Sequence, residues 1–462
     1  MKPLLASQIA RWCSARLLGE DVSVQSIAID SRQVAPAALF VAIIGERCDG
    51  HDFCLPAAQA GAAALLVSRP VQSELPQLLC ADTVAALGDI AAAVQRTRDT
   101  RVLALTGSNG KTSVKALLLA ILERHAPTCA NPGNRNNEIG LPLAVLDAPE
   151  QARYAIYEMG AGKPDDIAYL SSIARPHIAL VNNVAPAHLE RMGSLLGIAQ
   201  TKAAIYESLP GDGVAIINAD DAFCQFFADI AAPRRCLRFA LEHSADISAH
   251  AVLLDSEGSR FDLQLPDATL PIRLRLPGRH NVMNALAASA MAHAAGVPAA
   301  IIGEGLHAAR GVAGRQQVRV LSQTVTVIDD SYNANPGSVA AAIDRLASTE
   351  GETWLVLGDM AELGEGSAVL HAELGDRARR AGLSAVWTTG PLSQQASRAF
   401  GDGGRHFHDQ TSLIDALRAQ LAERAQRVPL LILVKGSRSS AMETVVAALC
   451  PATSEHGGAH AA

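Results

Sequence analysis

A short polar loop between an apolar strand and an apolar helix constrains the fold more than any other feature of this sequence. Residues 102–105 read VLAL, residues 106–113 read TGSNGKTS, and apolar side chains from Val114 to Leu122 then recur at helical spacing. A strand, a glycine loop, Lys-Thr and a helix in this order predict a P-loop, where backbone N–H groups and the helix N-terminus bind phosphate. We therefore expect a parallel α/β sheet that carries a nucleotide site.

The loop supplies the first candidate binding residues. Lys111 is expected to reach the β- and γ-phosphates of a nucleotide, and the Thr112 hydroxyl is expected to ligate Mg²⁺. Leu105 occupies the first glycine position of the common GxxxxGK[ST] pattern, so the match is to the shorter GxxGKT. The flanking strand and helix favour a nucleotide site over an ordinary turn. The predicted nucleotide-binding residues of the loop are Gly107, Ser108, Asn109, Gly110, Lys111, Thr112 and Ser113.

The remaining pattern divides the 462 residues into three α/β regions and a tail. Residues 1–97 alternate short apolar runs with turns, residues 98–313 repeat a strand–loop–helix rhythm, and residues 314–450 form a second α/β unit. Residues 451–462 are small and polar, and we expect them to be disordered. The predicted fold class is α/β in three domains: a small N-terminal α/β domain, a central P-loop ATPase-like parallel-sheet domain and a C-terminal Rossmann-like domain.

Individual elements follow from the same pattern. Apolar and polar residues alternate within 246–276, which predicts an antiparallel patch of β-sheet inside the central region. The other candidate strands lie at 154–158, 177–181, 213–217, 325–329, 354–357, 385–388 and 430–434. Candidate helices of the last region lie at 337–347, 370–381, 411–424 and 439–449.

Composition and charge exclude several classes of protein. Hydrophobic residues make up 49% and charged residues 18%, which excludes wholesale disorder, and the net charge of −7 has the wrong sign for nucleic-acid binding. The eight cysteines contain no CxxC pair, which indicates reduced thiols rather than a zinc site. Arg11 and Arg16 interrupt the N-terminal apolar stretch, and residues 296–298 break the longest uncharged stretch into two short helices. We expect a cytoplasmic protein without a membrane span or a nucleic-acid partner.

Three residues outside the loop are further candidates for the site. Glu158 ends the predicted strand 154–158, and His188 follows the strand 177–181, so both lie at carboxyl ends of strands, where ligands bind in open α/β sheets. Each, taken alone, is more often a surface residue than a ligand. Lys202 lies in an apolar helical stretch; it is either a surface lysine with a buried stem, or a site lysine that faces phosphate or is chemically modified.

Together these stretches resemble the Mur ligase family, the ATP-dependent amide-forming enzymes of peptidoglycan synthesis. The resemblance extends over about residues 25–450, and the family's shortened P-loop accounts for the missing first glycine. Within the family, the C-terminal motifs resemble those of the members that add D-alanyl-D-alanine to UDP-N-acetylmuramoyl-tripeptide. The motifs are TGSNGKTS at 106–113, GNRNNEIG at 133–140, LPGRHNVMNA at 276–285, DDSYNANP at 329–336, LGDMAELG at 357–364 and VKGSRSSAME at 434–443.

The resemblance implies a role for each matching position. Thr112, Glu158 and His188 would hold Mg²⁺, and Lys202 matches the lysine that the family carbamylates, which gives it oxygens that an ammonium lacks. The expected catalytic residues are Lys111, Lys202, Glu158 and His188. Beyond the loop, the expected ATP contacts are Asn281, Asn284, Arg315 and Asp330. The expected substrate contacts are Ser31, Arg32, Asp49, Gly50, His51, Asn134, Asn136, Asn137, Tyr332, Asn333, Asn335, Lys435, Ser437 and Arg438, the first five of them in a UDP-substrate-binding N-terminal domain.

The resemblance also implies a reaction and its partners. ATP would convert the terminal carboxylate of UDP-N-acetylmuramoyl-tripeptide into an acyl phosphate, and the amine of D-alanyl-D-alanine would attack it. Two alternatives stay open: a sister ligase that uses another amine, and a non-catalytic P-loop nucleotide switch. A switch has no need of Lys202 or of the first domain. We expect the chain to act as a monomer.

Overall fold

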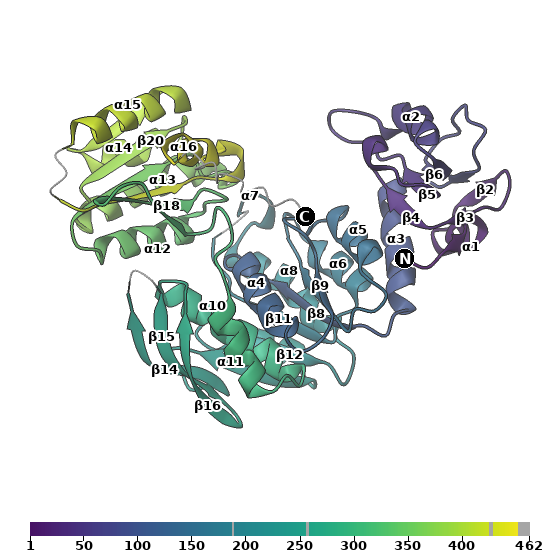
Figure 1. The fold of residues 1–462 in the computed structure, drawn as a ribbon, viewed down its shortest axis with the longest axis horizontal. Helices are drawn as coiled ribbons and strands as arrows, with labels where there is room; N and C mark the ends of the chain where they lie inside the picture. Colours follow the sequence, from purple (N-terminus) through teal and green to yellow (C-terminus); the bar gives the residue numbers. More distant parts are fainter. Residues whose placement is uncertain (187–188, 256–257, 425–427, 451–462) are drawn as a thin grey trace, which may run out of the picture. The chain divides into compact units, whose positions relative to one another are not determined.

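A computed structural model describes residues 1–186, 189–255, 258–424 and 428–450 (Figure 1). The predicted tail at 451–462 and the predicted metal ligand His188 lie outside these residues. The chain forms two compact units, one made of Met1–Val184 with Leu196–Ala309, and the other made of Ala185–Leu195 with the chain from Arg310 onward. Each unit is built on sheets that are covered by helices.

The N-terminal part of the first unit contains a five-stranded sheet in which β7, β6, β5 and β4 run parallel and β2 pairs antiparallel at one edge. In sheet order the strands are β2 (Arg16–Leu18), β7 (Gln77–Leu79), β6 (Ala62–Val67), β5 (Ala38–Val41) and β4 (Ser26–Ala28). The remaining elements are β1 (Leu4–Leu5), paired with β3 (Ser23–Val24), and α1 (Ala6–Trp12), η1 (Ser31–Gln33), η2 (Gly50–Phe53), α2 (Cys54–Gln59) and α3 (Thr83–Arg96).

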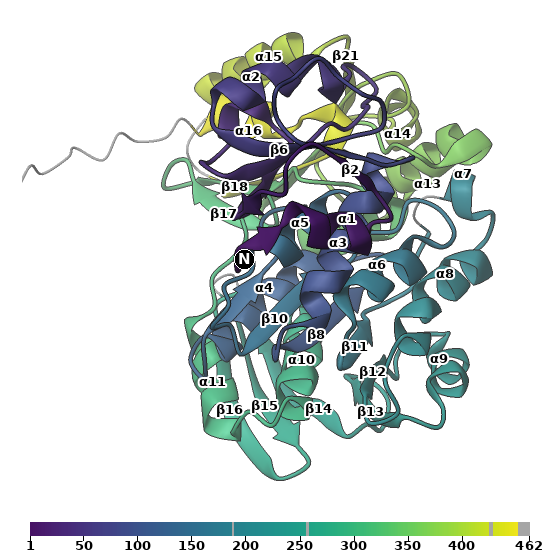
Figure 2. The ribbon, with the colours of Figure 1, turned by 90° about the vertical axis from the view of Figure 1, so that its right-hand side faces the viewer.

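The centre of the first unit is a nine-stranded sheet, parallel from β9 to β14 and antiparallel from β14 to β16. Figure 2 shows β10, β8, β11, β12 and β13 following one another across it. In sheet order the strands are β16 (Ala268–Leu274), β15 (Ser259–Leu265), β14 (Ile247–Leu254), β13 (Arg235–Ala240), β12 (Val214–Asn218), β11 (Ile178–Val181), β8 (Arg101–Thr106), β10 (Tyr154–Glu158) and β9 (Thr128–Ala130).

Alternation of side chains along these strands explains how helices cover the sheet. Leu103 and Leu105 of β8 point into one continuous core with the apolar face of α4 (Lys111–Leu122), as the spacing predicted. The helices α10 (Arg279–Ala294) and α11 (Ala299–Ala308) join the same core, so the long uncharged stretch forms two helices, as expected. The other helices of this part are α5 (Gly140–Asp147), α6 (Asp166–Ala174), α8 (Leu195–Glu207) and α9 (Cys224–Ala231).

The order of the strands sets the place of a ligand site. The chain leaves β8 to form β9 and β10 on one side of it, and then crosses to form β11 and β12 on the other side. Such a reversal of strand order opens a crevice at the carboxyl ends of the strands, next to β8. The loops that follow β8, β10 and β11 begin at this edge.

The second unit holds a six-stranded sheet with separate cores on its two faces. Ile328, Leu355 and Leu433 lie in one core, whereas their neighbours Val327, Val356 and Val434 lie in the other. Figure 1 shows α12 and α15 on opposite sides of this sheet. In sheet order the strands are β17 (Gln317–Val320), β18 (Val325–Asp330), β22 (Leu430–Lys435), β19 (Glu352–Leu357), β20 (Ala385–Thr389) and β21 (Gly404–Phe407). The helices are α7 (Leu189–Met192), α12 (Pro336–Ala347), η3 (Gly364–Gly366), α13 (Ser367–Arg380), α14 (Gln394–Phe400), α15 (Gln410–Glu423), η4 (Arg438–Ser440) and α16 (Glu443–Leu449).

The α/β class and the predicted strands are confirmed. The three large sheets fall inside the predicted ranges 1–97, 98–313 and 314–450, and the boundaries themselves stay predictions. The antiparallel patch is present as β14, β15 and β16. Among the residues described, no helix is long and apolar enough to cross a membrane.

Candidate functional site

The loop between β8 and α4 has the backbone of a phosphate-binding loop. Gly107 and Gly110 have positive φ angles of 154° and 80°. A Cβ on Gly110 would stand 2.5 Å from Asn284 Oδ1, so side chains are excluded there on two grounds. In the described chain no side chain caps the N-terminus of α4, and the dipole of this helix favours an anion there.

Lys111 begins α4 and turns back over the loop. Its Nζ donates to the carbonyl oxygen of Gly107 at 2.7 Å, which holds the ammonium over the loop. Thr112 and Ser113 follow in the first turn and are partly buried. The loop thus presents a fixed positive charge and a hydroxyl at the carboxyl edge of β8.

Asparagine side chains hold the loop in this shape. Asn183 lies two residues after the end of β11. Its carbonyl oxygen accepts from the Ser108 N–H at 3.0 Å, and its side-chain oxygen accepts from the Asn109 N–H at 2.8 Å. Asn182 Nδ2 donates to the Asn109 carbonyl at 3.0 Å and lies 3.2 Å from Asn284 Oδ1. The predicted nucleotide residue Asn284 is therefore tied to the loop through Asn182.

The other predicted residue of this helix lies one turn earlier. Asn281 Nδ2 donates to the Pro277 carbonyl at 2.8 Å, and its Oδ1 lies 3.5 Å from Asn284 Nδ2. Both asparagines are buried. They join the start of α10 to the phosphate loop.

Glu158 lies at the carboxyl end of β10, in register with Leu105 of β8. Its side chain is buried, and its two oxygens have different partners. Asn136 Nδ2 donates to Oε1 at 2.9 Å, and Lys115 Nζ lies 3.2 Å from Oε2. The predicted metal ligand is therefore a carboxylate beside the phosphate loop, held by an amide and an ammonium.

Lys202, in α8, is only 4% exposed, so the surface-lysine interpretation is excluded. Burial, together with the positive charge of Lys111, lowers the pKa of its ammonium from 10.5 to about 7. At neutral pH a large share of these side chains are neutral amines. A neutral amine is the form that adds carbon dioxide, so the residue suits the predicted carbamate.

The predicted metal ligands have the chemistry that a hard cation such as Mg²⁺ requires. Mg²⁺ prefers oxygen ligands, which Glu158 and the Thr112 hydroxyl offer, whereas Lys202 offers them only as a carbamate. His188 lies outside the described residues. Within the described ranges, no three His, Cys, Asp or Glu side chains gather to form a metal site by themselves. The donor set therefore fits a metal that is shared with phosphate oxygens, as in other nucleotide sites.

The loop after β9 carries the predicted substrate residues of the central domain. Asn134 and Asn137 are exposed, while Asn136 turns inward to Glu158. Asn137 Oδ1 accepts from the Gly140 N–H at 2.8 Å and so begins α5. Asn136 thus serves the carboxylate, and the other two side chains face solvent.

In the N-terminal domain, the predicted substrate residues form two local networks. Ser31 is half-buried in η1, and the exposed Arg32 makes a two-point contact with Asp30, at 2.9 and 2.7 Å. The Gly50 N–H donates to the Ile43 carbonyl at 2.8 Å and closes the second loop. These contacts keep both segments in fixed shapes.

Asp49 and His51 are the centre of the second network. Ser68 N–H donates to His51 Nε2 at 3.0 Å, so His51 Nδ1 carries the proton and donates to Asp49 at 2.6 Å. Asp49 also accepts from Arg69 at 2.7 Å. The His51 backbone N–H, the Arg69 guanidinium and the His51 ring lower the pKa of Asp49. His51 is buried, so its side chain fixes the loop, and Arg69 is the cation exposed beside it.

The predicted residues of the second unit gather at the carboxyl ends of β18 and β22. Lys435 Nζ donates to Asp330 Oδ2 at 2.6 Å and to the Asn333 carbonyl at 2.9 Å, and both charged side chains are buried. Asn335 caps α12 in a capping box with Ser338. Asp330 and Asn333 are thus linked to Lys435, and Asn335 is linked to α12.

A cationic pair flanks Tyr332 in the same unit. The guanidinium carbon of Arg315 lies 4.2 Å from the ring centroid, and that of Arg438 lies 5.9 Å from it, both within cation–π range. Ser437 Oγ lies 3.1 Å from the hydroxyls of Ser439 and Ser440. The structure therefore brings all eight predicted residues of this unit into one region at the ends of two neighbouring strands.

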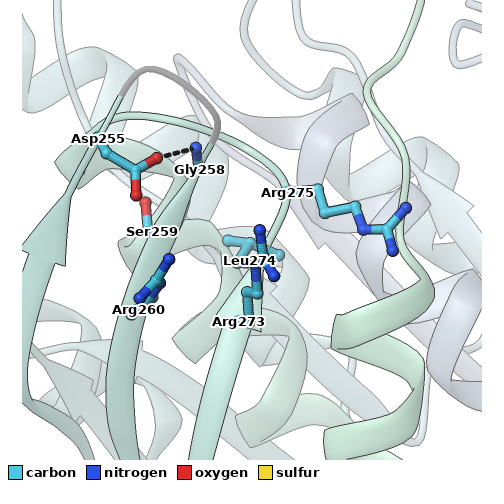
Figure 3. A pocket seen from close by; sticks show the side chains of 7 residues that line it. All are labelled: Asp255, Gly258, Ser259, Arg260, Arg273, Leu274 and Arg275. Carbon is cyan, nitrogen blue, oxygen red and sulfur yellow. Dashed lines mark hydrogen bonds between the residues drawn. The ribbon is translucent and has the colours of Figure 1, made fainter.

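A cavity of about 290 Å³ lies on the antiparallel patch of the first unit. Figure 3 shows Arg260 and Arg273 on neighbouring strands, with Arg275 directed away from them. β15 lies five strand positions from β8, which is about 24 Å at the usual strand spacing. The cavity is therefore separate from the phosphate loop. Its lining is Asp255, Gly258, Ser259, Arg260, Arg273, Leu274 and Arg275.

The fold and the loop define a P-loop α/β protein with an acidic residue and a buried lysine in its central domain. Three family models match the chain: "Mur ligase family, catalytic domain" at residues 23–101, "Mur ligase middle domain" at 105–292 and "Mur ligase, glutamate ligase domain" at 314–438. The chain belongs to the Mur ligase family.

Individual relatives agree with this over nearly the whole chain. A curated relative from Escherichia coli K12, named UDP-N-acetylmuramoyl-tripeptide--D-alanyl-D-alanine ligase, is 44% identical over 96% of this chain and 97% of its own. A crystal structure of MurF from Acinetobacter baumannii has a TM-score of 0.92 and 33% identity, covering 97% of this chain and 99% of that one. MurF ligase from Thermotoga maritima in complex with ADP has a TM-score of 0.81 and 28% identity, with coverages of 92% and 97%.

Several residues of the site were not predicted from the sequence. They are the loop-holding Asn182 and Asn183, the pair Asn131 and Lys115 behind Glu158, and Arg69 beside Asp49. Asn182 and Asn183 directly follow a predicted strand at its carboxyl end, which was the available signal. Lys115 lies between apolar residues of a helix in a chain with only six lysines, and that scarcity was the signal for it.

Proposed function

We propose that this chain is an ATP-dependent ligase that joins D-alanyl-D-alanine to UDP-N-acetylmuramoyl-tripeptide in the synthesis of peptidoglycan precursors. The observation that carries the proposal is the end-to-end similarity to relatives of that name, 44% over 96% of the chain, together with a phosphate loop of the required geometry. The ADP complex of the Thermotoga relative supports nucleotide binding by this chain.

The reaction proceeds in two steps. The terminal carboxylate of the tripeptide attacks the γ-phosphorus of ATP, which forms an acyl phosphate and releases ADP. The amine of D-alanyl-D-alanine then attacks the acyl carbon, a proton leaves the amine, and inorganic phosphate departs. Lys111 and the N-terminus of α4 lower the barrier of the first step because they offset the repulsion between the carboxylate and the triphosphate.

Thr112 and Glu158 would hold Mg²⁺ at this edge of the sheet, with Lys202 as a carbamate and with His188. A bound Mg²⁺ would supply screening of the phosphate charge. Lys202 prepares for this role as a buried amine whose pKa is about 7, so it takes up carbon dioxide and loses a proton under neutral conditions. The carbamate carries a negative charge, so it attracts the Lys111 ammonium, whereas a protonated Lys202 would repel it.

The two other groups of predicted residues serve the substrates. In the N-terminal domain, Ser31, Arg32 and the loop held by Asp49, Gly50 and His51 bind the UDP part. In the C-terminal domain, Arg315 and Asp330 contact ATP. The central loop contributes Asn134, Asn136 and Asn137 to the tripeptide, and the remaining C-terminal substrate residues are Tyr332, Asn333, Asn335, Lys435, Ser437 and Arg438.

A phosphate-release assay tests the function directly. The purified chain, ATP and MgCl₂ are combined with UDP-N-acetylmuramoyl-tripeptide, carrying either lysine or diaminopimelate, and with one amine at a time. We expect phosphate release with D-alanyl-D-alanine and none with single amino acids. Release with a different amine would assign the chain to a sister ligase, and nucleotide binding without any amine-dependent release would favour a switch. We also expect a monomer by light scattering, and place the enzyme in the cytoplasm.

A further inference from the structure

Lys115 is a buried charge with no part in the steps above. It lies one helical turn after Lys111 on α4 and is 6% exposed. Its Nζ donates to the carbonyl oxygens of Asn131 and Gly133, each at 2.9 Å, and lies 3.2 Å from Glu158 Oε2. Two of the three N–H donors of the ammonium thus have acceptors, and the contact with Glu158 is an ion pair. Because both acceptors are backbone carbonyls, the position of the charge is fixed by the chain itself.

The partners of Lys115 also hold each other. Asn131 Oδ1 accepts from the Glu158 N–H at 2.9 Å, and Asn131 Nδ2 donates to the Glu158 carbonyl at 3.0 Å. Asn131 Nδ2 also donates to the Arg135 carbonyl at 2.8 Å, directly before Asn136, whose amide donates to Glu158 Oε1. The loop after β9, the end of β10 and helix α4 therefore meet at one ammonium and one carboxylate.

The two contacts fix the orientation of the Glu158 carboxylate. A carboxylate offers about four lone-pair sites on its two oxygens. Asn136 donates to Oε1, and Lys115 forms an ion pair with Oε2, so each oxygen is held by a group of the chain. A carboxylate that ligates a metal is commonly fixed in this way by groups behind it.

We propose that Lys115 is a positioning residue that fixes the direction in which Glu158 meets Mg²⁺ and that joins this carboxylate to the substrate loop at residues 131–136. The inference rests on the proposed function, because it takes Glu158 as the metal ligand. The contacts of Lys115 are with Glu158 and with the carbonyls of the loop, so it acts through them. It also connects the helix of the phosphate loop to both of them.

The sign of one measurement separates positioning from the two other roles that a buried lysine could have. Removal of a positive charge beside Glu158 would by itself make the site more attractive to a divalent cation. A lysine that served only as a charge would thus weaken Mg²⁺ binding, and its loss would strengthen it. A lysine that served only the stability of the fold would leave the Mg²⁺ dependence of the folded variant unchanged.

The experiment compares Lys115→Met with Lys2→Met, which removes an exposed lysine at the N-terminus. ADP binding is measured by calorimetry at a series of MgCl₂ concentrations, which gives the concentration at which the ADP affinity is half its maximum. The MgCl₂ concentration that gives half the maximal rate of phosphate release is measured in parallel. We expect both to rise about tenfold or more in Lys115→Met, as is usual for loss of a group behind a metal ligand. Lys2→Met should match the parent chain.

Two further readouts complete the test. The KM for the UDP-tripeptide should rise with the loss of Lys115, whereas ADP affinity without MgCl₂ should stay near that of the parent chain. Lys115→Arg retains a cation with several donors and should lie between the two; it also serves if Lys115→Met does not fold. Unchanged or lower half-saturating MgCl₂ in a folded variant overturns the inference. Absence of phosphate release from the parent chain would instead refute the proposed function.

Discussion

Replacement of Lys202 by methionine should stabilise the metal-free and carbonate-free protein at neutral and acidic pH. The side chain is buried, and burial together with Lys111 holds its pKa at about 7 instead of 10.5. The folded state therefore binds the proton much more weakly than the unfolded chain does. Below pH 7 the proton is bound in both states, and the folded state contains a buried charge.

The difference between the two pKa values sets the size of the effect. One pKa unit corresponds to about 1.4 kcal/mol, so the difference between 10.5 and about 7 is worth about 5 kcal/mol. The free energy of unfolding should rise with pH between 7 and 10.5, because only the unfolded chain keeps its proton in this window. Below pH 7 the full cost of about 5 kcal/mol is present, and above pH 10.5 it is gone.

Methionine has a similar length and no charge, so Lys202→Met should remove this cost and this slope. The assay is guanidinium chloride unfolding of both proteins at a series of pH values in buffers free of carbon dioxide. We expect the variant to be more stable by several kcal/mol below pH 7, with the advantage shrinking as the pH approaches 10.5. Lys163→Met removes an exposed lysine and should change the stability by less than about 0.5 kcal/mol.

Two results would refute this reasoning. One is a pH dependence of stability that is the same in Lys202→Met and in the parent chain. The other is a variant that is less stable than the parent below pH 7. Added bicarbonate gives an internal check, because a carbamate on Lys202 should stabilise the parent chain and leave the methionine variant unaffected.

Three further predictions concern activity, a buried ion pair and acid stability. Lys202→Ala should be nearly inactive in phosphate release and partly restored by a short carboxylic acid; full activity without rescue would rule out the carbamate. Lys435→Met leaves Asp330 buried without its cation and should destabilise the C-terminal domain by about 3–5 kcal/mol in thermal unfolding, with Asp330→Asn added to it restoring part of the loss. Burial lowers the pKa of His371, which accepts the Met360 N–H at 2.9 Å, so stability should fall as the pH drops below 6.5. His371→Gln should reduce this loss of stability below pH 6.5. The same loss in the variant and in the parent chain would assign it to other titrating groups.

The elements that the sequence predicted best are those with both a periodic pattern and a clear end. β8, its glycine loop and α4 were predictable because the strand, the two glycines and the helical apolar face each give a separate signal. β18, β19, β20 and β22 were predictable because they are apolar runs buried on both faces. Short strands such as β9, with three residues, lack a pattern long enough to read.

Strand order was the main feature that local patterns could not supply. The pairing of β10 with β8 brings Glu158 beside the phosphate loop, and it depends on packing between segments about fifty residues apart. The sequence only placed Glu158 at the carboxyl end of some strand. The same holds for Asp330 and Lys435, which are more than a hundred residues apart and meet because β18 pairs with β22.

Contacts between buried polar groups were the other feature that the sequence did not predict. Periodicity shows that a helix has an apolar face, but it does not show that Lys115 turns from α4 toward two backbone carbonyls and a carboxylate. His51 was predicted as a substrate residue, and the structure shows that its ring is enclosed between Asp49 and Ser68. For Lys202, two interpretations were open, and only its burial decided between them.

The most direct test of the proposed ligase is phosphate release that depends on both substrates. The account predicts release from ATP only when UDP-N-acetylmuramoyl-tripeptide and D-alanyl-D-alanine are both present, with one pentapeptide product formed for each phosphate. Lys111→Ala, which removes the ammonium that lies 2.7 Å from the Gly107 carbonyl, should keep the fold and lose at least about a hundredfold in rate. Phosphate release that is independent of the dipeptide, or a Lys111→Ala variant with near-normal rate, would contradict the account.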